Sequence, residues 1–176
     1  MVTLIGQKLA ENKMPTYKSL TLLLTIGLMP VGHAIADVSK VDQKQNAMVN
    51  MKIATITKMY QQDIDDQGIS NPVVLQQYAD ADLQAAMQLE QEYFEKTQTS
   101  CNIDYDVLWN SQDPDYMQDK NFSITDQGLV QVSLAQGSDI YYELSCDDND
   151  KNCQVADVVL AQDDKTLRQH LLETCR

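Results

Sequence analysis

The chain has 176 residues with 13 basic and 26 acidic side chains, which gives a formal net charge of −13 at pH 7. This excess of acid repels nucleic acid phosphates and anionic lipid, so it argues against both classes of partner. It attracts a basic protein and speeds association with it, although acidity also keeps an exported protein soluble without any partner.

The first 36 residues have the layout of a secretory signal peptide. A basic segment comes first and holds three lysines: Lys8, Lys13 and Lys18. An apolar run follows over 20–29, and the segment closes on Ala34-Ile35-Ala36, so we expect cleavage after Ala36. A membrane anchor is the alternative interpretation, but the run has about half of the ~20 residues that span a bilayer, and Pro30 interrupts it.

Cleavage leaves residues 37–176, for which we expect a single domain with one core. Glu11 and the three lysines leave with residues 1–36, so 10 basic and 25 acidic residues remain, a net charge of about −15. The start codon is open between Met1 and Met14. No cysteine directly follows the cleavage site to carry a lipid, so we expect a periplasmic protein that does not insert stably into a membrane.

Helical periodicity dominates the front of this chain. Over 41–64, apolar side chains recur at steps of three and four and form one core-facing stripe: Val49, Ile53, Ile56, Tyr60 and Ile64. Ser70-Asn71-Pro72 predicts the cap and first turn of a short helix that ends at Tyr78. A third helix is expected over 81–96. Its apolar positions are Leu83, Ala86, Met87, Leu89, Tyr93 and Phe94, and its outer acids are Glu90, Glu92 and Glu95.

A long polar loop is expected between 97 and 121, and loops of this length in a compact domain are often functional. Four acids form two Asp-x-Asp pairs: Asp104 with Asp106, and Asp113 with Asp115. Their spacing does not match a calcium-binding helix-loop-helix, so we expect no metal here. Turn formation and solvation are the roles that the acids alone indicate. Trp109 either packs the loop against the body or binds a partner, because Trp is enriched at interfaces. We predict that these four acids and Trp109 form a partner-binding surface.

Four antiparallel strands are predicted next, over 122–125, 129–134, 139–145 and 154–160. Asp126-Gln127-Gly128 supplies the first hairpin turn. Apolar and polar residues alternate over 130–134, which predicts one buried and one wetter face. Asp163-Asp164 is then expected to cap a final helix that runs to Cys175.

All four cysteines lie after the expected cleavage site, and an even count in an exported chain favours disulfides. Four cysteines allow three pairings. Cys146 and Cys153 flank a polar turn between two predicted strands, so they can pair across a hairpin, which leaves Cys101 for Cys175. Zinc is the alternative, but the gap between Cys146 and Cys153 exceeds the usual ligand spacing and only one histidine, His170, follows the cleavage site.

Several segments together resemble a bacterial group called domain of unknown function 3828. They are Tyr60, Leu83-Gln84-Ala85-Ala86, Glu90, Tyr93-Phe94, Asp104-Tyr105-Asp106, Asn110-Ser111-Gln112-Asp113, and the closing strand and helix over 154–159 and 166–172. The resemblance covers nearly all of 37–176. The group is similar to the nuclear-transport-factor-2-like superfamily, which implies an α+β cone with N-terminal helices packed on a curved antiparallel sheet, a C-terminal helix and a pocket. Where this chain has Cys153 the family motif often has an aromatic residue, which implies a locally added disulfide.

Motifs that would indicate an enzyme are absent from the sequence. It contains no Gly-x-Ser-x-Gly, Gly-x-Gly-x-x-Gly, phosphate-loop or His-Glu-x-x-His motif. We expect His170 at the edge of the core in a structural role. An acid–base site built from Asp157 with Tyr141 or Tyr142 is the alternative that the resemblance leaves open.

These observations lead to a non-enzymatic periplasmic binding protein without a cofactor. The hypothesis is an inhibitor or immunity-type protein that neutralises a basic effector, for example a toxin or cell-wall hydrolase. A small-ligand carrier or pocket enzyme of the cone fold is the alternative, and it requires a cavity with converging polar groups. A structural envelope component would instead expose a large apolar patch.

Overall fold

The computed structural model describes residues 35–147, 152–160 and 165–176. Within these ranges the elements are α1 (Ile35–Asp66), α2 (Val74–Tyr78), α3 (Ala81–Thr97), β1 (Lys120–Ile124), β2 (Val130–Leu134), β3 (Asp139–Asp147), β4 (Asn152–Val159) and α4 (Leu167–Thr174). The expected α+β class is confirmed. The expected signal peptide lies outside the described residues, apart from Ile35 and Ala36 where α1 begins.

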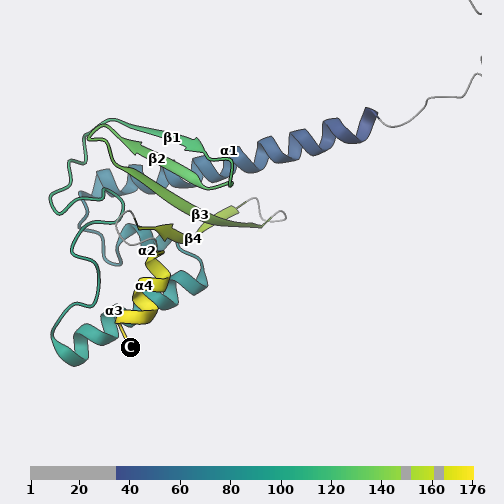
Figure 1. Ribbon diagram of the computed structural model, residues 1–176. Helices are drawn as coiled ribbons and strands as arrows, with labels where there is room; N and C mark the ends of the chain where they lie inside the picture. The colour runs from purple at the N-terminus through teal and green to yellow at the C-terminus, as the bar shows by residue number, and fades with distance from the viewer. Residues whose placement is uncertain (1–34, 148–151, 161–164) are drawn as a thin grey trace, which may run out of the picture. The chain divides into compact units, whose positions relative to one another are not determined.

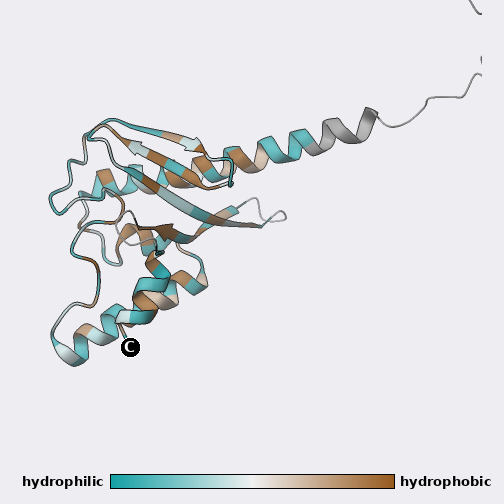
Figure 2. Cartoon of the chain, in the orientation of Figure 1, coloured by the Kyte–Doolittle hydropathy of each residue, from teal (hydrophilic) through white to brown (hydrophobic). Residues whose placement is uncertain are grey.

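α1 runs across the sheet and contacts all four strands (Figure 1). Ile56 and Tyr60 of the predicted stripe are fully buried, whereas Val49, Ile53 and Ile64 are half-buried at its margins. The helix begins six residues before the expected range 41–64. Residues 42–47 are polar or small and exposed, so no apolar period marked them (Figure 2). α1 ends where Gln67 and Gly68 adopt left-handed backbone angles, φ 51° and 69°.

The expected start of α2 is wrong. Pro72 precedes the helix by two residues, the cap position is Val73, and no side chain caps it. Val74 and Leu75 are buried. The helix is therefore stabilised by the burial of these two side chains, and not by the Ser-Asn-Pro cap and first turn that the sequence predicted.

α3 matches its predicted range closely. The carboxylate of Asp80 caps it by accepting hydrogen bonds from the backbone N–H groups of Asp82 and Leu83, at 3.1 and 3.0 Å. The prediction that Phe94 belongs to the buried apolar face of α3 is wrong, because its side chain is 51% exposed. It lies about three turns beyond Leu83 on the same side, where the helix has passed the elements that cover its first half, and residues 94–100 are all exposed.

The sheet is an antiparallel meander in the order β1-β2-β3-β4. The expected alternation is confirmed in β2, where Val130, Val132 and Leu134 are buried and the two residues between them are half-buried. In the turn before β2, Gly128 has a φ of 80°, which favours glycine. The register of β3 with β4 shifts between Glu143 and Leu144, at a bulge or irregularity.

Helices α2, α3 and α4 gather beside β4, the last strand of the sheet (Figure 1). α4 packs against both α3 and β4. Its cap is Thr166, whose side chain accepts a hydrogen bond from the backbone N–H of Gln169 at 3.3 Å. The expected Asp163-Asp164 cap lies outside the described residues, and α4 begins at Leu167, after the Thr166 cap.

Both expected disulfides are present, and the described residues contain no free cysteine. Cys146 and Cys153 are direct partners across the β3–β4 ladder. Cys101 and Cys175 join the start of the long loop to the residue after α4 across 74 positions of sequence. None of the described helices is both long enough and apolar enough to cross a bilayer.

Candidate functional site

The loop between α3 and β1 folds back on itself around Asp106. One oxygen of this carboxylate accepts hydrogen bonds from the backbone N–H groups of Leu108 and Trp109, at 2.8 and 3.3 Å. The backbones of Asp106 and Ser111 pair in an isolated antiparallel bridge. A tight turn therefore places Leu108 and Trp109 toward the core.

The start of the same loop is tied down from two sides. Thr174 donates a hydrogen bond to the carbonyl oxygen of Cys101 at 3.0 Å, next to the disulfide to Cys175. The amide nitrogen of Asn102 donates to Glu90 of α3 at 2.9 Å. Glu90 was expected on the outer face of α3, but this contact leaves it half-buried.

Trp109 is buried, with 1% of its surface exposed, as the packing interpretation expected. Its ring packs edge-on against Tyr60 and Tyr116, with centroid distances of 5.2 and 5.4 Å. The indole Nε1 donates a hydrogen bond to Oδ2 of Asp63 at 2.6 Å. Trp109 thus anchors the loop to α1 and presents almost no surface to a partner.

Two tyrosines complete the buried network. The hydroxyl of Tyr60 donates to the carbonyl oxygen of Leu108, so the Tyr142 hydroxyl must donate to that of Tyr60, at 2.9 Å. Burial raises the pKa of both phenols, so both stay neutral at physiological pH. The network links α1, β3 and the loop through groups that all have partners.

Asp63 and Asp106 are the acids beside this network. Burial raises the pKa of Asp106 to about 6, with a further contribution from the charge of Asp63, while the two backbone donors oppose the shift. Burial raises the pKa of Asp63 too, against the effect of the Trp109 N–H. Both acids therefore lie in surroundings that disfavour their charged forms.

A cavity of about 240 Å³ opens beside these two acids. Its polar lining comes from Asp63, Glu90, Asn102, Tyr105 and Asp106, and its apolar lining from Val73, Val74, Leu75, Met87, Val107, Leu108, Leu167 and Leu171, with Gly68 completing it. This is slightly below the roughly 300–1,000 Å³ of pockets for drug-sized ligands. The space therefore suits a small molecule or one side chain.

The other predicted loop acids do not line this cavity. Asp104, Asp113 and Asp115 are exposed. Asp104 also lines a polar groove of about 470 Å³ together with His170. His170 is half-buried, and its Nε2 has no hydrogen-bond partner within the part of the chain that the structure describes.

The alternative acid–base site combines Asp157 with one of two tyrosines, and only one of these can lie on its face of the sheet. Tyr141 and Tyr142 are adjacent on β3, so their side chains leave the strand on opposite faces. Asp157 of β4 accepts hydrogen bonds from the backbone N–H of Arg168 at 3.0 Å and from its Nε at 3.3 Å. Its carboxylate therefore holds the start of α4.

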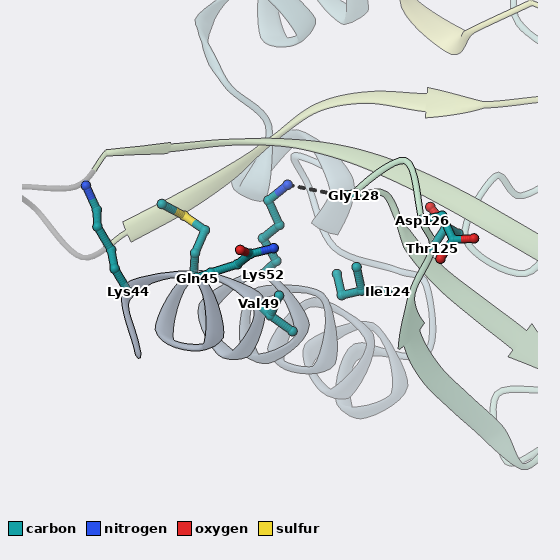
Figure 3. A pocket seen from close by; sticks show the side chains of 9 residues that line it. Lys44, Gln45, Val49, Lys52, Ile124, Thr125, Asp126 and Gly128 are labelled. Carbon is teal, nitrogen blue, oxygen red and sulfur yellow. Dashed lines mark hydrogen bonds between the residues drawn. The ribbon is translucent and has the colours of Figure 1, made fainter. Parts of the chain in front are cut away.

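A second hollow lies between α1 and the β1–β2 turn (Figure 3). It measures about 440 Å³, and Val49 and Ile124 line it from the two sides. Lys52 reaches over it and donates a hydrogen bond to the carbonyl oxygen of Gly128 at 2.9 Å. That lysine fixes the turn, and no buried acid or amide lines this hollow.

Sequence reasoning missed Asp63, Tyr60 and Glu90 as site residues. One signal for Asp63 was present: it follows Tyr60 by three positions, on the apolar stripe of α1. A carboxylate on a core-facing stripe needs a partner or a ligand.

Comparisons with known proteins found no match: no protein family, no curated protein and no solved structure matches the chain.

Proposed function

We propose that this protein binds a basic protein partner outside the cytoplasm and acts as an inhibitor or immunity-type protein without catalysis. The observation that carries the proposal is the anchored loop between α3 and β1. It is held by a disulfide, a buried tryptophan and an Asp-centred turn, yet it exposes Asp104, Asp113 and Asp115. A surface fixed before binding loses less conformational entropy in a complex.

Charge supports the same partner class. No lysine or arginine in the described ranges forms an ion pair with Asp104, Asp113 or Asp115. Together with the acidic composition, these carboxylates favour rapid association with a cationic surface. A toxin or cell-wall hydrolase with a basic face is a partner of this kind.

The proposal includes the cellular location of the protein. The basic, apolar and Ala-x-Ala segments over 1–36 and the two disulfides support export to the periplasm. N-terminal sequencing of protein recovered from a Gram-negative periplasm should begin at Asp37. Retention of Lys18 would contradict it.

We also propose that the fold is of the nuclear-transport-factor-2-like kind and that the chain is related to domain of unknown function 3828. The order of elements supports this relation: helices first, then an antiparallel meander, then a final helix. The packing of α1 against all four strands supports the same relation, because helices of that superfamily pack on the concave side of the sheet. An experimental structure with an uncurved sheet would contradict the proposal.

The proposed function is tested on the partner captured from periplasm. We expect the triple variant Asp104→Asn/Asp113→Asn/Asp115→Asn to slow association about tenfold and to flatten its salt dependence, since exposed charges act mainly on the association rate. The matched control changes three exposed acids elsewhere, Asp65→Asn/Asp126→Asn/Glu143→Gln, with the same change in charge. Equal effects in both variants, or none in the first, would remove the loop from the interface.

The small-ligand alternative has one observation in its favour, the cavity beside Asp63 and Asp106. A small-ligand carrier needs a cavity with converging polar groups. Here three carboxyl side chains and one amide line an otherwise apolar cavity. A melting-temperature screen of small cations against neutral analogues of the same size separates a ligand carrier from a protein that lacks a ligand.

A further inference from the structure

The cavity beside Asp63 is lined by acids without compensating bases. Its lining includes Asp63, Glu90 and Asp106 and contains no lysine, arginine or histidine. Asp63 is only 5% exposed, its Oδ2 accepts a hydrogen bond from the neutral Trp109 N–H, and it forms no ion pair with a lysine or arginine of the described ranges. A buried carboxylate in this state requires a proton or a cation.

The apolar residues that line the rest of the cavity indicate which kind of molecule bears the positive charge. Val74 and Leu75 of α2 and Leu167 and Leu171 of α4 contribute aliphatic side chains to the lining. An aliphatic body gains by leaving water for such walls, while the acids select a positive head. A bare metal ion fits poorly, because no group of three or more His, Cys, Asp or Glu within the described ranges is arranged to hold one.

We propose that this cavity binds a primary ammonium group carried on a short aliphatic chain. Asp63 and Asp106 receive the head, and the leucine and valine side chains of α2 and α4 surround the chain. Asp104, Asp113 and Asp115 do not line the cavity, so the binding test described below can fail while the charge test of the basic-protein interface succeeds, and the reverse.

Two sources supply this chemistry: a free alkylamine, or a lysine side chain of a bound protein. The surroundings of the cavity favour the lysine source. Val73, which lines the cavity, is 49% exposed, and Ile69, next to the lining residue Gly68, is 81% exposed. Exposed apolar side chains around a polar pocket are typical of protein interfaces.

Protonation of Asp106 should control the site. Its carboxyl interacts with Asp63 and Tyr60 of α1, Tyr142 of β3 and Tyr116 of its own loop. Alkylammonium keeps its charge up to a pH of about 10. Affinity should therefore rise as the pH passes through about 6, where Asp106 loses its proton. Asp106→Asn should reduce this dependence.

The test measures binding of hexylammonium, of uncharged hexanol and of Nα-acetyl-lysine-N-methylamide to the purified protein at pH 7.5. Calorimetry gives the affinities, and methyl NMR shifts of Leu167 and Leu171 locate the site. We expect hexylammonium to bind about tenfold or more tightly than hexanol, because only the charged head meets the carboxylates. Tight binding of the lysine derivative would assign the source to a protein, and preference for hexylammonium would assign it to a free amine.

Variants sharpen the result. Asp63→Asn and Asp106→Asn keep the oxygen that accepts hydrogen bonds from Trp109 or from the turn, so both should fold. Each should weaken hexylammonium about tenfold and leave hexanol unchanged, whereas the exposed control Asp65→Asn should change neither. If a variant fails to fold, the wild-type comparison decides. Equal binding of hexylammonium and hexanol, or no binding of hexylammonium, would overturn the proposal.

Discussion

Asp157 on β4 and Asp63 on α1 are both buried, with 3% and 5% of their surfaces exposed, but only Asp157 has a cationic partner. Asp157 meets Arg168 at 3.3 Å and accepts backbone hydrogen bonds from Val158 of β4 and from Arg168 at the start of α4. Asp63 has one neutral donor, Trp109, and faces a cavity. Proteins normally pair a buried charge, and this difference between the two acids is the basis of the ammonium-site proposal.

The largest effect should come from removing the disulfide between the loop that Asp63 anchors through Trp109 and the end of α4, the helix that Asp157 holds. The disulfide Cys101–Cys175 joins the loop to the end of α4 across 74 positions, whereas Cys146–Cys153 spans 7. Loop-closure entropy predicts a loss in the free energy of unfolding of about 4 kcal/mol for the double serine variant of the first pair, and about 2.5 kcal/mol for that of the second. Urea unfolding measures both. A larger loss for Cys146–Cys153 would contradict this ranking.

The next effect tests the paired acid. Asp157→Ala removes a charge-assisted hydrogen bond and the support of two backbone N–H groups, so it should lower the free energy of unfolding by about 2–3 kcal/mol. Asp82→Ala is the control, because Asp82 also pairs with Arg168, at 3.6 Å, but is exposed. It should cost about 0.5 kcal/mol or less. Similar losses for both would show that Arg168 does not depend on its buried partner.

The third prediction concerns Asp106 of the cavity, where substitution should stabilise the protein at neutral pH. Since folding raises the pKa of Asp106 from 3.8 to about 6, the folded protein binds this proton more tightly than the unfolded chain. This contribution is complete below pH 3.8 and is lost as the pH rises through 6. Asp106→Asn has no such titrating group, so its free energy of unfolding should rise relative to that of wild type between pH 4 and pH 7. At pH 7 the variant should be roughly 1–3 kcal/mol more stable.

Thermal unfolding of both proteins at pH 4 and pH 7 measures the difference. The buffer series also titrates every other carboxylate, so the result is the change in the difference between variant and wild type. A variant that loses stability relative to wild type as the pH rises would mean that ionised Asp106 is stabilised in the fold.

Much of this fold was predictable because its signals are local. The stripe of α1, the alternation of β2 and the cysteines flanking the β3–β4 turn each lie within a short stretch of sequence. The errors have local causes as well: Pro72 suggested a first turn that the chain does not use, and Phe94 continued the apolar period of α3 beyond the core. Periodicity records which face is apolar, and says nothing about where the neighbouring elements end.

The candidate site was harder to predict because it is assembled from distant segments. Asp63 and Asp106 come from α1 and the loop, 43 positions apart, and Glu90 joins them from α3. The sequence singled out Asp106 in an Asp-x-Asp pair, and the turn role expected for these acids is confirmed at Asp106, but no local signal placed it beside a cavity. Trp109 was placed on a partner surface, and its burial leaves the exposed acids as the part of that prediction still to be tested.

The pKa of Asp106 tests the central claim, that the cavity holds acids without a compensating cation, most directly. The side-chain carboxyl ¹³C resonance of Asp106, assigned by its loss in Asp106→Asn, is followed from pH 3 to pH 8 in the protein without ligand. We predict a midpoint of about 6, because burial and the neighbouring Asp63 disfavour the charged form. A midpoint at or below the ordinary 3.8 would mean that the carboxylate is already compensated and would contradict the account.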